Sequence, residues 1–424
     1  MNALRLLPFV LLLAPAGAAV GDWPQFRGPA GNGVADGVEP PPESWSESGA
    51  VDWTADVPGE GWSAPVVAGD NVLLTAAVPT EADAYRFEVI CYALQDGAER
   101  WRRVAFEQTP REPKHGDNTF ASETPAADDE RVFAYFGMNG LVCYTLGGDL
   151  VWKKDLGAYP MDNDWGTSSS PALADGRLFL QIDNEQESFL VALDAATGDE
   201  LWRAQRPNER SNWSSPIVWK NSRGTEVVAG GKTVRSYDAA SGREIWSMEI
   251  GGRSSASPSA VGDVLYVGSE NRTQRGGTPG GLFAVGAGAS GEIDVTDPDA
   301  AAQGLVWANT SGAVGIASPL VYHGQIYVPE RRGGVLRAHD AQTGEETFRT
   351  RLPGGGVFWA SPIAIGDRVY VTDERGKTFV LAPGPEREIL QTSALPGRFW
   401  STPAVADGAL LFRSQDKLYC VRTP

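Results

Sequence analysis

The sequence predicts an all-β protein that folds as an eight-bladed β-propeller of four-stranded antiparallel blades. Eight times along the chain a proline in a context rich in serine and threonine opens an apolar strand, at intervals of 41 to 61 residues. The 424 residues include 50 glycines and 29 prolines, which indicates many tight turns. No segment beyond the first twenty residues has the 3.6-residue apolar period of a helix. A fixed internal period in such a turn-rich chain is typical of a propeller.

The repeat begins at a proline and contains the signals for four strands. A short apolar strand, a Gly-Asp or Asp-Gly turn and a second apolar strand follow most of the prolines, as in residues 257–267, and this is a hairpin signature. A third strand then leads through an Asp-, Thr- and Gly-rich turn to a tryptophan, as in residues 192–202. Four strands make one propeller blade. The eight repeat prolines are Pro65, Pro125, Pro171, Pro216, Pro258, Pro319, Pro362 and Pro403.

Large aromatic residues mark the outer strands of most units. We expect each of these rings to end its strand and to bridge two neighbouring blades, which buries on the order of 200 Å² per ring. Phe348 takes this place in the sixth unit, and residues 389–390 replace the ring in the seventh. The five tryptophans are Trp101, Trp152, Trp202, Trp246 and Trp307.

The last unit is one strand short, and this indicates how the ring closes. It ends after three predicted strands, whereas residues 51–55 form an unassigned strand before the first repeat. An open series of sheets would leave exposed edges that favour aggregation. We therefore expect residues 51–55 to complete the blade formed by residues 401–421, so that residues 20–424 form a single propeller domain.

Residues 1–19 have the pattern of a secretory signal peptide. Arg5 supplies a positive start, residues 6–13 are apolar, and small residues follow up to Ala19. The apolar run is too short for a membrane helix, and no other run approaches the roughly 20 residues that one needs. We expect cleavage and a periplasmic or secreted product without a transmembrane segment, with an uncleaved anchor as the alternative.

Charge and cysteine content exclude several classes of function. A net charge of −18 argues against nucleic-acid binding and against anionic membrane surfaces. Three cysteines, Cys91, Cys143 and Cys420, lie in apolar strand contexts. Because an odd number cannot pair fully, we expect buried free thiols and no disulfide.

The sequence contains no strong catalytic or metal-binding motif. It has three histidines, none at ligand spacing, and neither a CxxC nor an HExxH motif, so no zinc site is expected. The acidic loop 294–299 lacks the pattern of a calcium-binding loop. We therefore assign no catalytic residue and no metal ligand.

Two sets of side chains are predicted to meet on one face of the propeller. In a four-stranded blade, the loop that leads into the inner strand and the loop between the second and third strands lie on the same side. The first loop carries a tryptophan three residues before four of the repeat prolines, and Trp165 lies in a related loop. An aromatic wall inside a charged rim could hold a planar ligand, a sugar or a peptide. The candidate residues are Trp62, Trp213, Trp359, Trp400 and Trp165, with Asn184, Glu270, Asn271, Glu330, Arg331, Asp373 and Glu374 on the rim.

Structural roles are the alternative for both sets. The tryptophans could simply pack between blades, and the charged residues could be solvated turns. The two longest intervals hold insertions at residues 107–120 and within residues 272–303. Loops on a rigid scaffold are where function is most often found.

Several segments resemble a known family. Residues 192–202 and 236–246 resemble the PQQ-like repeat. Residues 21–29 and 113–125 resemble exported PQQ-binding-like, BamB-like propeller proteins of planctomycete-type bacteria. The resemblance covers essentially the whole predicted mature chain. It implies the propeller fold, whereas it says little about activity.

The resemblance implies two functional classes. The superfamily includes the BamB scaffold of outer-membrane protein assembly and quinoprotein dehydrogenases that use PQQ and calcium. This sequence lacks the adjacent cysteine pair of alcohol-oxidising members and the Cys-x-x-Cys-His haem site. We therefore expect a monomeric, non-catalytic binding or scaffold module for a protein or glycan partner. The alternative is a PQQ- and calcium-dependent alcohol or sugar dehydrogenase, with a rim carboxylate such as Asp373 or Glu330 as base.

Overall fold

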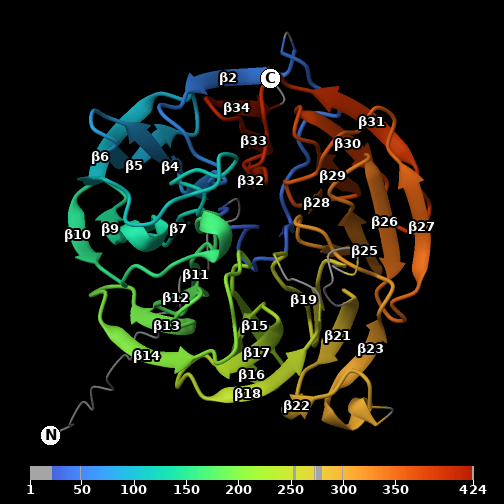
Figure 1. The fold of residues 1–424 in the computed structure, drawn as a ribbon. Helices are drawn as coiled ribbons and strands as arrows, with labels where there is room; N and C mark the ends of the chain where they lie inside the picture. Colours follow the sequence, from blue (N-terminus) through green and yellow to red (C-terminus); the bar gives the residue numbers. More distant parts are fainter. Residues whose placement is uncertain are drawn as a thin grey trace, which may run out of the picture.

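The chain forms a ring of eight β-sheets around a central axis (Figure 1). The computed structural model describes residues 22–47, 49–251, 255–271, 273, 279–297 and 299–422. Each sheet contains one four-stranded antiparallel blade that runs from the axis to the rim. The prediction of an eight-bladed propeller is confirmed.

Blades 1 to 4 follow each other along the chain. Blade 1 contains β3 (Val66–Ala68), β4 (Asn71–Pro79), β5 (Tyr85–Ala93) and β6 (Glu99–Gln108). Blade 2 contains β7 (Ala126–Ala127), β8 (Arg131–Tyr135), β9 (Leu141–Thr145) and β10 (Leu150–Lys154), with the short helix η1 (Gly137–Asn139). Blade 3 contains β11 (Ala172–Ala174), β12 (Arg177–Ile182), β13 (Phe189–Asp194) and β14 (Glu200–Gln205), preceded by η2 (Asp162–Asp164). Blade 4 contains β15 (Ile217–Asn221), β16 (Gly224–Ala229), β17 (Thr233–Asp238) and β18 (Glu244–Glu249).

Blades 5 to 8 complete the ring. Blade 5 contains β19 (Ser259–Val261), β20 (Val264–Gly268), β21 (Leu282–Gly286) and β23 (Leu305–Asn309). Blade 6 contains β24 (Leu320–Tyr322), β25 (Gln325–Pro329), β26 (Val335–Asp340) and β27 (Glu346–Arg351). Blade 7 contains β28 (Ile363–Ile365), β29 (Arg368–Thr372), β30 (Lys377–Leu381) and β31 (Ile389–Ala394). Blade 8 contains β32 (Ala404–Ala406), β33 (Ala409–Arg413), β34 (Lys417–Arg422) and, from the start of the chain, β2 (Val51–Asp56).

Each repeat proline directly precedes the innermost strand of its blade. Proline lacks a backbone N–H and therefore suits the first position of a strand, where no ladder bond is lost. The eight prolines thus mark the points at which the chain reaches the axis.

The strand β2 closes the ring as predicted. It pairs antiparallel with β34, in a register that places Trp53 opposite Cys420 and Asp56 opposite Lys417. Figure 1 shows β2 beside β34 at the top of the ring. The two ends of the propeller are therefore joined within one blade.

The outer-strand tryptophans join neighbouring blades. The indole Nε1 of Trp101 donates to the Leu146 carbonyl of blade 2 at 2.8 Å, and that of Trp202 donates to the Ala239 carbonyl of blade 4 at 3.2 Å. Trp246 differs, because its Nε1 donates to Glu226 within its own blade. The expectation that these rings end their strands is wrong. Each is the third residue of its outer strand, beside a β-bulge that shifts the strand register.

The cysteines and one insertion have structural roles. Cys91, Cys143 and Cys420 are buried free thiols, as predicted. Part of the blade 5 insertion crosses to blade 4, where β22 (Gly291–Ile293) pairs in parallel with the outer strand β18. The short helix η4 (Ala300–Gln303) then leads back to β23.

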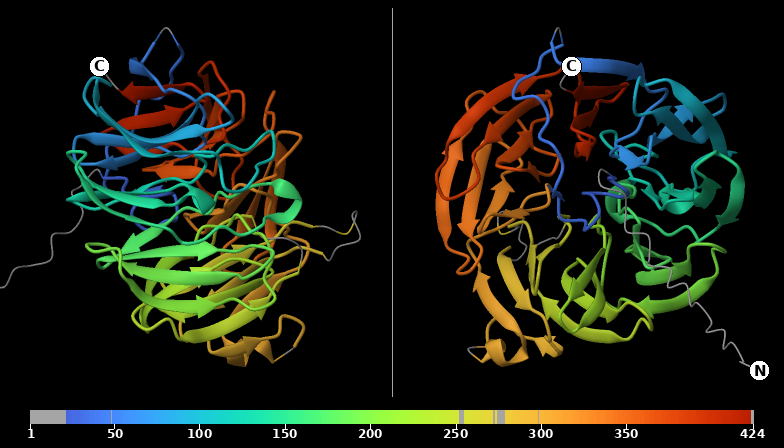
Figure 2. Two further views of the ribbon diagram at one scale, coloured as in Figure 1. Left: turned by 60° about the vertical axis from the view of Figure 1, so that its left-hand side comes forward. Right: turned by 180° about the vertical axis from the view of Figure 1, so that it is seen from behind.

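Residues 22–35 lie inside the ring, which the sequence did not reveal. Trp23 exchanges backbone hydrogen bonds with Val67 in blade 1. At the other end of the segment, β1 (Val34–Ala35) pairs in parallel with β28 of blade 7. Figure 2 (right) shows this dark blue segment within the ring. The repeat pattern could not predict it, because the segment does not belong to any repeat.

The predicted signal peptide, residues 1–19, lies outside the described part of the chain. In the part that the structure describes, no helix is long and apolar enough to cross a membrane.

Candidate functional site

A cavity of about 500 Å³ lies where the chain enters the inner strands of the blades. Its wall consists mainly of the residues one and three positions before the repeat prolines. The two positions are two residues apart on an extended chain, so their side chains point to the same side. The cavity brings together all five predicted tryptophans and two of the seven rim residues. The predicted residues that line the cavity are thus Trp62, Trp165, Trp213, Trp359 and Trp400, together with Glu270 and Arg331.

Three of the tryptophans form a continuous stack, which we call the tryptophan slab. The ring centroids of Trp359 and Trp400 are 3.7 Å apart, and those of Trp400 and Trp62 are 5.0 Å apart, with interplanar angles of 19° in both pairs. Elsewhere in the wall, Trp165 and Trp213 pack at 5.5 Å and 48°. The slab places three aromatic side chains side by side in one part of the cavity wall.

Hydrogen bonds and cations fix the slab in place. Trp62 Nε1 donates to the Asp117 carbonyl at 2.9 Å, and Trp359 Nε1 donates to the Glu374 carboxylate at 3.3 Å. The guanidinium of Arg331 lies 4.4 Å from the Trp359 ring centroid. Such cation–π contacts hold an aromatic ring from its face. Asp117 belongs to the insertion of residues 107–120. This loop, for which the sequence predicted no definite role, therefore holds one tryptophan of the slab.

A circle of hydrogen bonds surrounds the axis. We call the serine and threonine residues whose hydroxyls form it the hydroxyl ring. In seven successive blades, the residue before the repeat proline donates its backbone N–H to the hydroxyl of the equivalent residue in the next blade, at 2.9 to 3.0 Å. All seven acceptor residues are buried and line the cavity. They are Thr124, Ser170, Ser215, Ser257, Ser318, Ser361 and Thr402.

The circle is interrupted once, at the junction of the last blade with the first. Blade 1 has Ala64 at the equivalent position, and alanine offers no hydroxyl to the Thr402 backbone. Sequence reasoning missed these ring residues as site residues. The signal was present, since a serine or threonine precedes seven of the eight repeat prolines.

The amino-terminal segment forms the base of the cavity. Phe26 lines it, and the side chain of the next residue, Arg27, is fully buried. The Arg27 guanidinium donates to the carbonyls of Pro258 at 3.2 Å and Pro319 at 2.6 Å, which belong to blades 5 and 6. Burial lowers the pKa of Arg27 to about 9, so the side chain stays charged at neutral pH.

The same segment contacts the inner strands of other blades in order. Besides Val67 of blade 1, it accepts backbone N–H bonds from blades 2, 3 and 7. These donors are Ala127 to the Pro24 carbonyl, Leu173 to the Gln25 side chain and Ala364 to the Gly33 carbonyl. The segment therefore fills the lumen next to the cavity, and the cavity is closed on that side.

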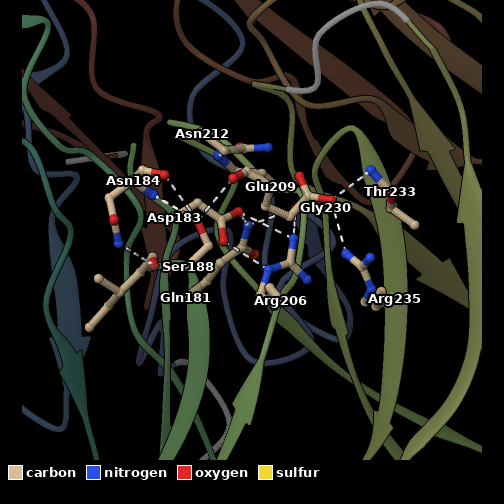
Figure 3. A network of polar contacts seen from close by, with 12 residues as sticks. Gln181, Asp183, Asn184, Ser188, Arg206, Glu209, Asn212, Gly230, Thr233 and Arg235 are labelled. Carbon is tan, nitrogen blue, oxygen red and sulfur yellow. Dashed lines mark hydrogen bonds and ion pairs between the residues drawn. The ribbon is translucent and has the colours of Figure 1, made fainter. Parts of the chain in front are cut away.

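The predicted rim residue Asn184 lies outside the cavity, in a buried network between blades 3 and 4 (Figure 3). Its side chain accepts the backbone N–H groups of Gln186 and Glu187, which fixes its own loop. Beside it, Asp183 and Arg206 form an ion pair at 2.8 Å with both side chains almost fully buried. The charge after this second strand therefore forms an ion pair within blade 3, and Arg206 also donates to the Gly230 carbonyl of blade 4 at 2.7 Å.

Four other predicted rim residues also lie outside the cavity wall. Asp373 accepts three backbone N–H groups, and Glu330 forms an ion pair with Arg349 at 2.8 Å. Glu374 acts on the site only through its bond to the Trp359 indole. Asn271 is exposed beside Glu270 and accepts bonds from Thr273.

The positions of the carboxylates bear on the dehydrogenase alternative. Calcium prefers six to eight oxygen ligands, several of them carboxylates. Among the described residues, no group of three or more His, Cys, Asp or Glu side chains could hold a metal ion. Asp373 and Glu330, the carboxylates suggested as base, lie outside the cavity wall, where both Asp373 oxygens accept backbone N–H groups and Glu330 Oε1 pairs with Arg349. The described residues do not fit a calcium-bound quinone.

The blades and the repeated Ser/Thr-Pro motif that opens them define the class of PQQ-like repeat propellers. A family profile described as outer membrane protein assembly factor BamB matches residues 85–232, 230–351 and 331–422. The chain belongs to this family. A protein named outer membrane protein assembly factor BamB, from Burkholderia pseudomallei (strain K96243), is 31% identical over 188 residues, which are 38% of this chain and 46% of that protein.

Solved structures share the fold at low sequence identity. The crystal structure of BamB from Moraxella catarrhalis has a TM-score of 0.60 and 13% identity, over 87% of this chain and 96% of that chain. The quinohemoprotein alcohol dehydrogenase from Comamonas testosteroni has a TM-score of 0.63 and 12% identity, over 96% and 81%. These similarities show the fold alone, since the same architecture hosts binding proteins and enzymes.

Proposed function

We propose that this chain is a non-catalytic, extracytoplasmic binding module whose site is the tryptophan-lined cavity and the loops around it. One observation carries the proposal. Five tryptophans from different blades face a single cavity that the amino-terminal segment closes on one side. A concave site that combines aromatic side chains with fixed polar groups is typical of ligand recognition.

The nature of the wall supports recognition more than chemistry. Its aromatic side chains are held by hydrogen bonds and stacking, so little ordering remains to be done on binding. The family description, an outer membrane protein assembly factor, is consistent with a scaffold. The partner, a protein segment or a glycan, would present an apolar or cyclic group to the tryptophan slab.

Fluorescence titration tests the proposal. The purified chain is titrated with a panel of defined oligosaccharides and short peptides, and the tryptophan emission is recorded. We expect at least one compound to shift the emission in a saturable manner. The double substitution W359A/W400A should abolish that response, while L390A, on an exposed side chain of the outer strand β31, should keep it.

Melting curves of both variants are recorded to test whether each variant retains the fold. A saturable response that survives W359A/W400A would place the site elsewhere and refute the proposal.

The dehydrogenase alternative has a direct test. The chain is incubated with PQQ and calcium, desalted and assayed for quinone absorbance and for dye-linked oxidation of alcohols or sugars. We expect neither, because the carboxylates do not converge beside the slab. Retained quinone with turnover would overturn the non-catalytic assignment.

The cellular location and the extent of the domain are also part of the proposal. We propose that residues 1–19 are removed on export and that residues 20–424 act as one monomeric domain. The mass of the protein recovered from an expressing bacterium, with its sedimentation coefficient, tests both points. A full-length mass or a dimer would contradict them.

A further inference from the structure

We propose that the cavity binds a small cyclic acid, with its carboxylate within the hydroxyl ring and its cyclic body against the tryptophan slab. The inference rests on the proposed function, because it names the ligand class of the same cavity. Three features carry it: unused hydroxyl protons, an excess of positive charge at the base of the cavity, and the spacing between the ring and the slab.

The hydroxyl ring is a set of donors that lack an acceptor among the described residues. Each of its seven hydroxyls accepts one backbone N–H from the preceding blade, and this uses an oxygen lone pair but not the hydroxyl proton. No described residue accepts a hydrogen bond from any of these seven protons. The seven residues line the cavity, so a ligand in it would meet hydroxyl donors from several blades. A carboxylate, which accepts through two oxygens, satisfies such an array.

The charge of the cavity favours an anion in an otherwise acidic protein. The whole chain has a net charge of −18. In the cavity wall, Arg331 and Arg332 balance Asp117 and Glu270. Arg27 adds a positive charge at the base, where it bonds only to carbonyl oxygens and forms no ion pair with a described carboxylate. A buried charge without a counterion attracts one strongly, because the surroundings screen it poorly.

The geometry limits the size of the ligand. The slab residues and the ring residues are two positions apart on one extended chain, which places them about 7 Å apart along the strand. A carboxylate within the ring would therefore place an attached six-membered ring beside the indoles. The volume of about 500 Å³ holds a compact molecule, and the amino-terminal segment closes one side. A single cyclic acid fits these limits, whereas a polymer threaded through the channel does not.

Two matched pairs of probes test the inference by calorimetric titration of the full chain. Glucuronate is compared with glucose, and benzoate with benzyl alcohol, so that charge is varied on a sugar and on an aromatic body. We expect the acid of at least one pair to bind at least about tenfold more tightly than its neutral partner, since hydrogen bonds to a charged group are the stronger ones. The pair that responds identifies the body, sugar or aromatic.

Two variants of the ring separate its donors from its structural role. S318A/S361A removes two neighbouring hydroxyls of the ring, one of them directly before Pro319, whose carbonyl accepts from Arg27. S318T/S361T keeps both hydroxyls, since threonine holds this position in other blades, at Thr124 and Thr402. We expect the alanine pair to weaken acid binding about tenfold or more and the threonine pair to retain it. Melting curves establish that both variants are folded. If the alanine pair does not fold, the single variant S361A replaces it.

The outcomes distinguish this inference from the proposed function. Equal binding of acids and neutral partners, or unchanged affinity in the folded alanine variant, would overturn the inference while the cavity remains a binding site. Failure of both acids to bind at millimolar concentration would also overturn it. The proposed function fails separately, if W359A/W400A leaves the binding of every compound in its panel unchanged.

Discussion

Glu123 is a single buried carboxyl group that should make stability depend on pH. It lies two positions before Pro125, and burial raises its pKa to about 7, against an ordinary value of 4.5. The folded chain thus keeps a proton that the unfolded chain releases between these two values. The sign follows from linkage: the contribution is fully present below pH 4.5 and is lost as the pH rises through 7, by roughly 3 kcal/mol.

Glu123→Gln tests this assignment. The variant keeps the shape of the protonated carboxyl and cannot ionise, so its free energy of unfolding should not fall through this window. Urea unfolding at pH 5 and at pH 8 measures the effect in both proteins. We expect the midpoint of the natural chain to fall more steeply between these pH values. An equal fall in the variant would show that other groups are responsible.

Ala64 is the gap in the hydroxyl ring, and a serine there should fill it. The variant Ala64→Ser would offer an acceptor to the Thr402 backbone and close the circle between blades 8 and 1. An added hydrogen bond of this kind stabilises by about 1 kcal/mol. Ala317→Ser is the control, because it buries a hydroxyl two positions before a repeat proline, outside the ring. Thermal melting should rise for the first and not for the second; a fall for Ala64→Ser would contradict the ring's role.

At the scale of elements, each outer-strand tryptophan of blades 1, 2, 3, 5 and 8 docks on a glycine of the next blade. In blade 3, Gly198 has a φ of +76°, and a Cβ there would lie 2.8 Å from the Trp152 ring of blade 2. Gly176, in the same blade, has a φ of +70° with nothing within 4 Å of such a Cβ. The two positions share the backbone requirement and differ only in the tryptophan contact.

Gly198→Ala and Gly176→Ala therefore separate the cost of a left-handed alanine from the cost of crowding the tryptophan ring. Both lose about 1 kcal/mol for a left-handed alanine. Gly198→Ala should lose a further 1 to 3 kcal/mol, on the order of an overpacked core, because the indole must move. Chemical unfolding of both variants measures the difference. Equal destabilisation would mean that the docked ring is not part of what holds the blades together.

The sequence predicted the elements better than it predicted the site. Repeat prolines and Asp-Thr-Gly turns are local signals, so strand order, blade number and closure by residues 51–55 could be read directly. The tryptophans before Pro65, Pro216, Pro362 and Pro403 converge because the repeat places them at equivalent points. Charges after the second strands, such as those of Asp183 and Glu330, have no such constraint. They serve ion pairs within their own blades, which only the packed structure shows.

At the scale of the whole molecule, the amino-terminal segment could not be predicted to lie in the lumen. Its hydrogen bonds reach the inner strands of six blades, or the prolines that precede those strands, none near it in sequence. No periodic pattern records such long-range contacts. The same segment supplies the base of the cavity and leads into β2, so closure of the ring and the shape of the site depend on one stretch of chain.

Trp53 is a large side chain that joins the closing strand to the next blade. Its Nε1 donates to the Leu94 carbonyl at 3.0 Å, and its ring lies over Gly97 of blade 1. Trp53→Ala should destabilise the fold by about 3 to 5 kcal/mol, as is usual for a buried tryptophan. Asp52→Ala, an exposed neighbour on β2, should change stability by less than about 0.5 kcal/mol. Similar melting of both variants would contradict closure through β2.

The central claim is that residues 22–56 hold the ring together from inside and close it at the rim. Scanning calorimetry of a chain without residues 20–56, compared with the mature chain, tests it most directly. The account predicts a transition at much lower temperature and with lower enthalpy, because blade 8 loses its outer strand and the inner strands lose their central contacts. An unchanged melting temperature and enthalpy would contradict it.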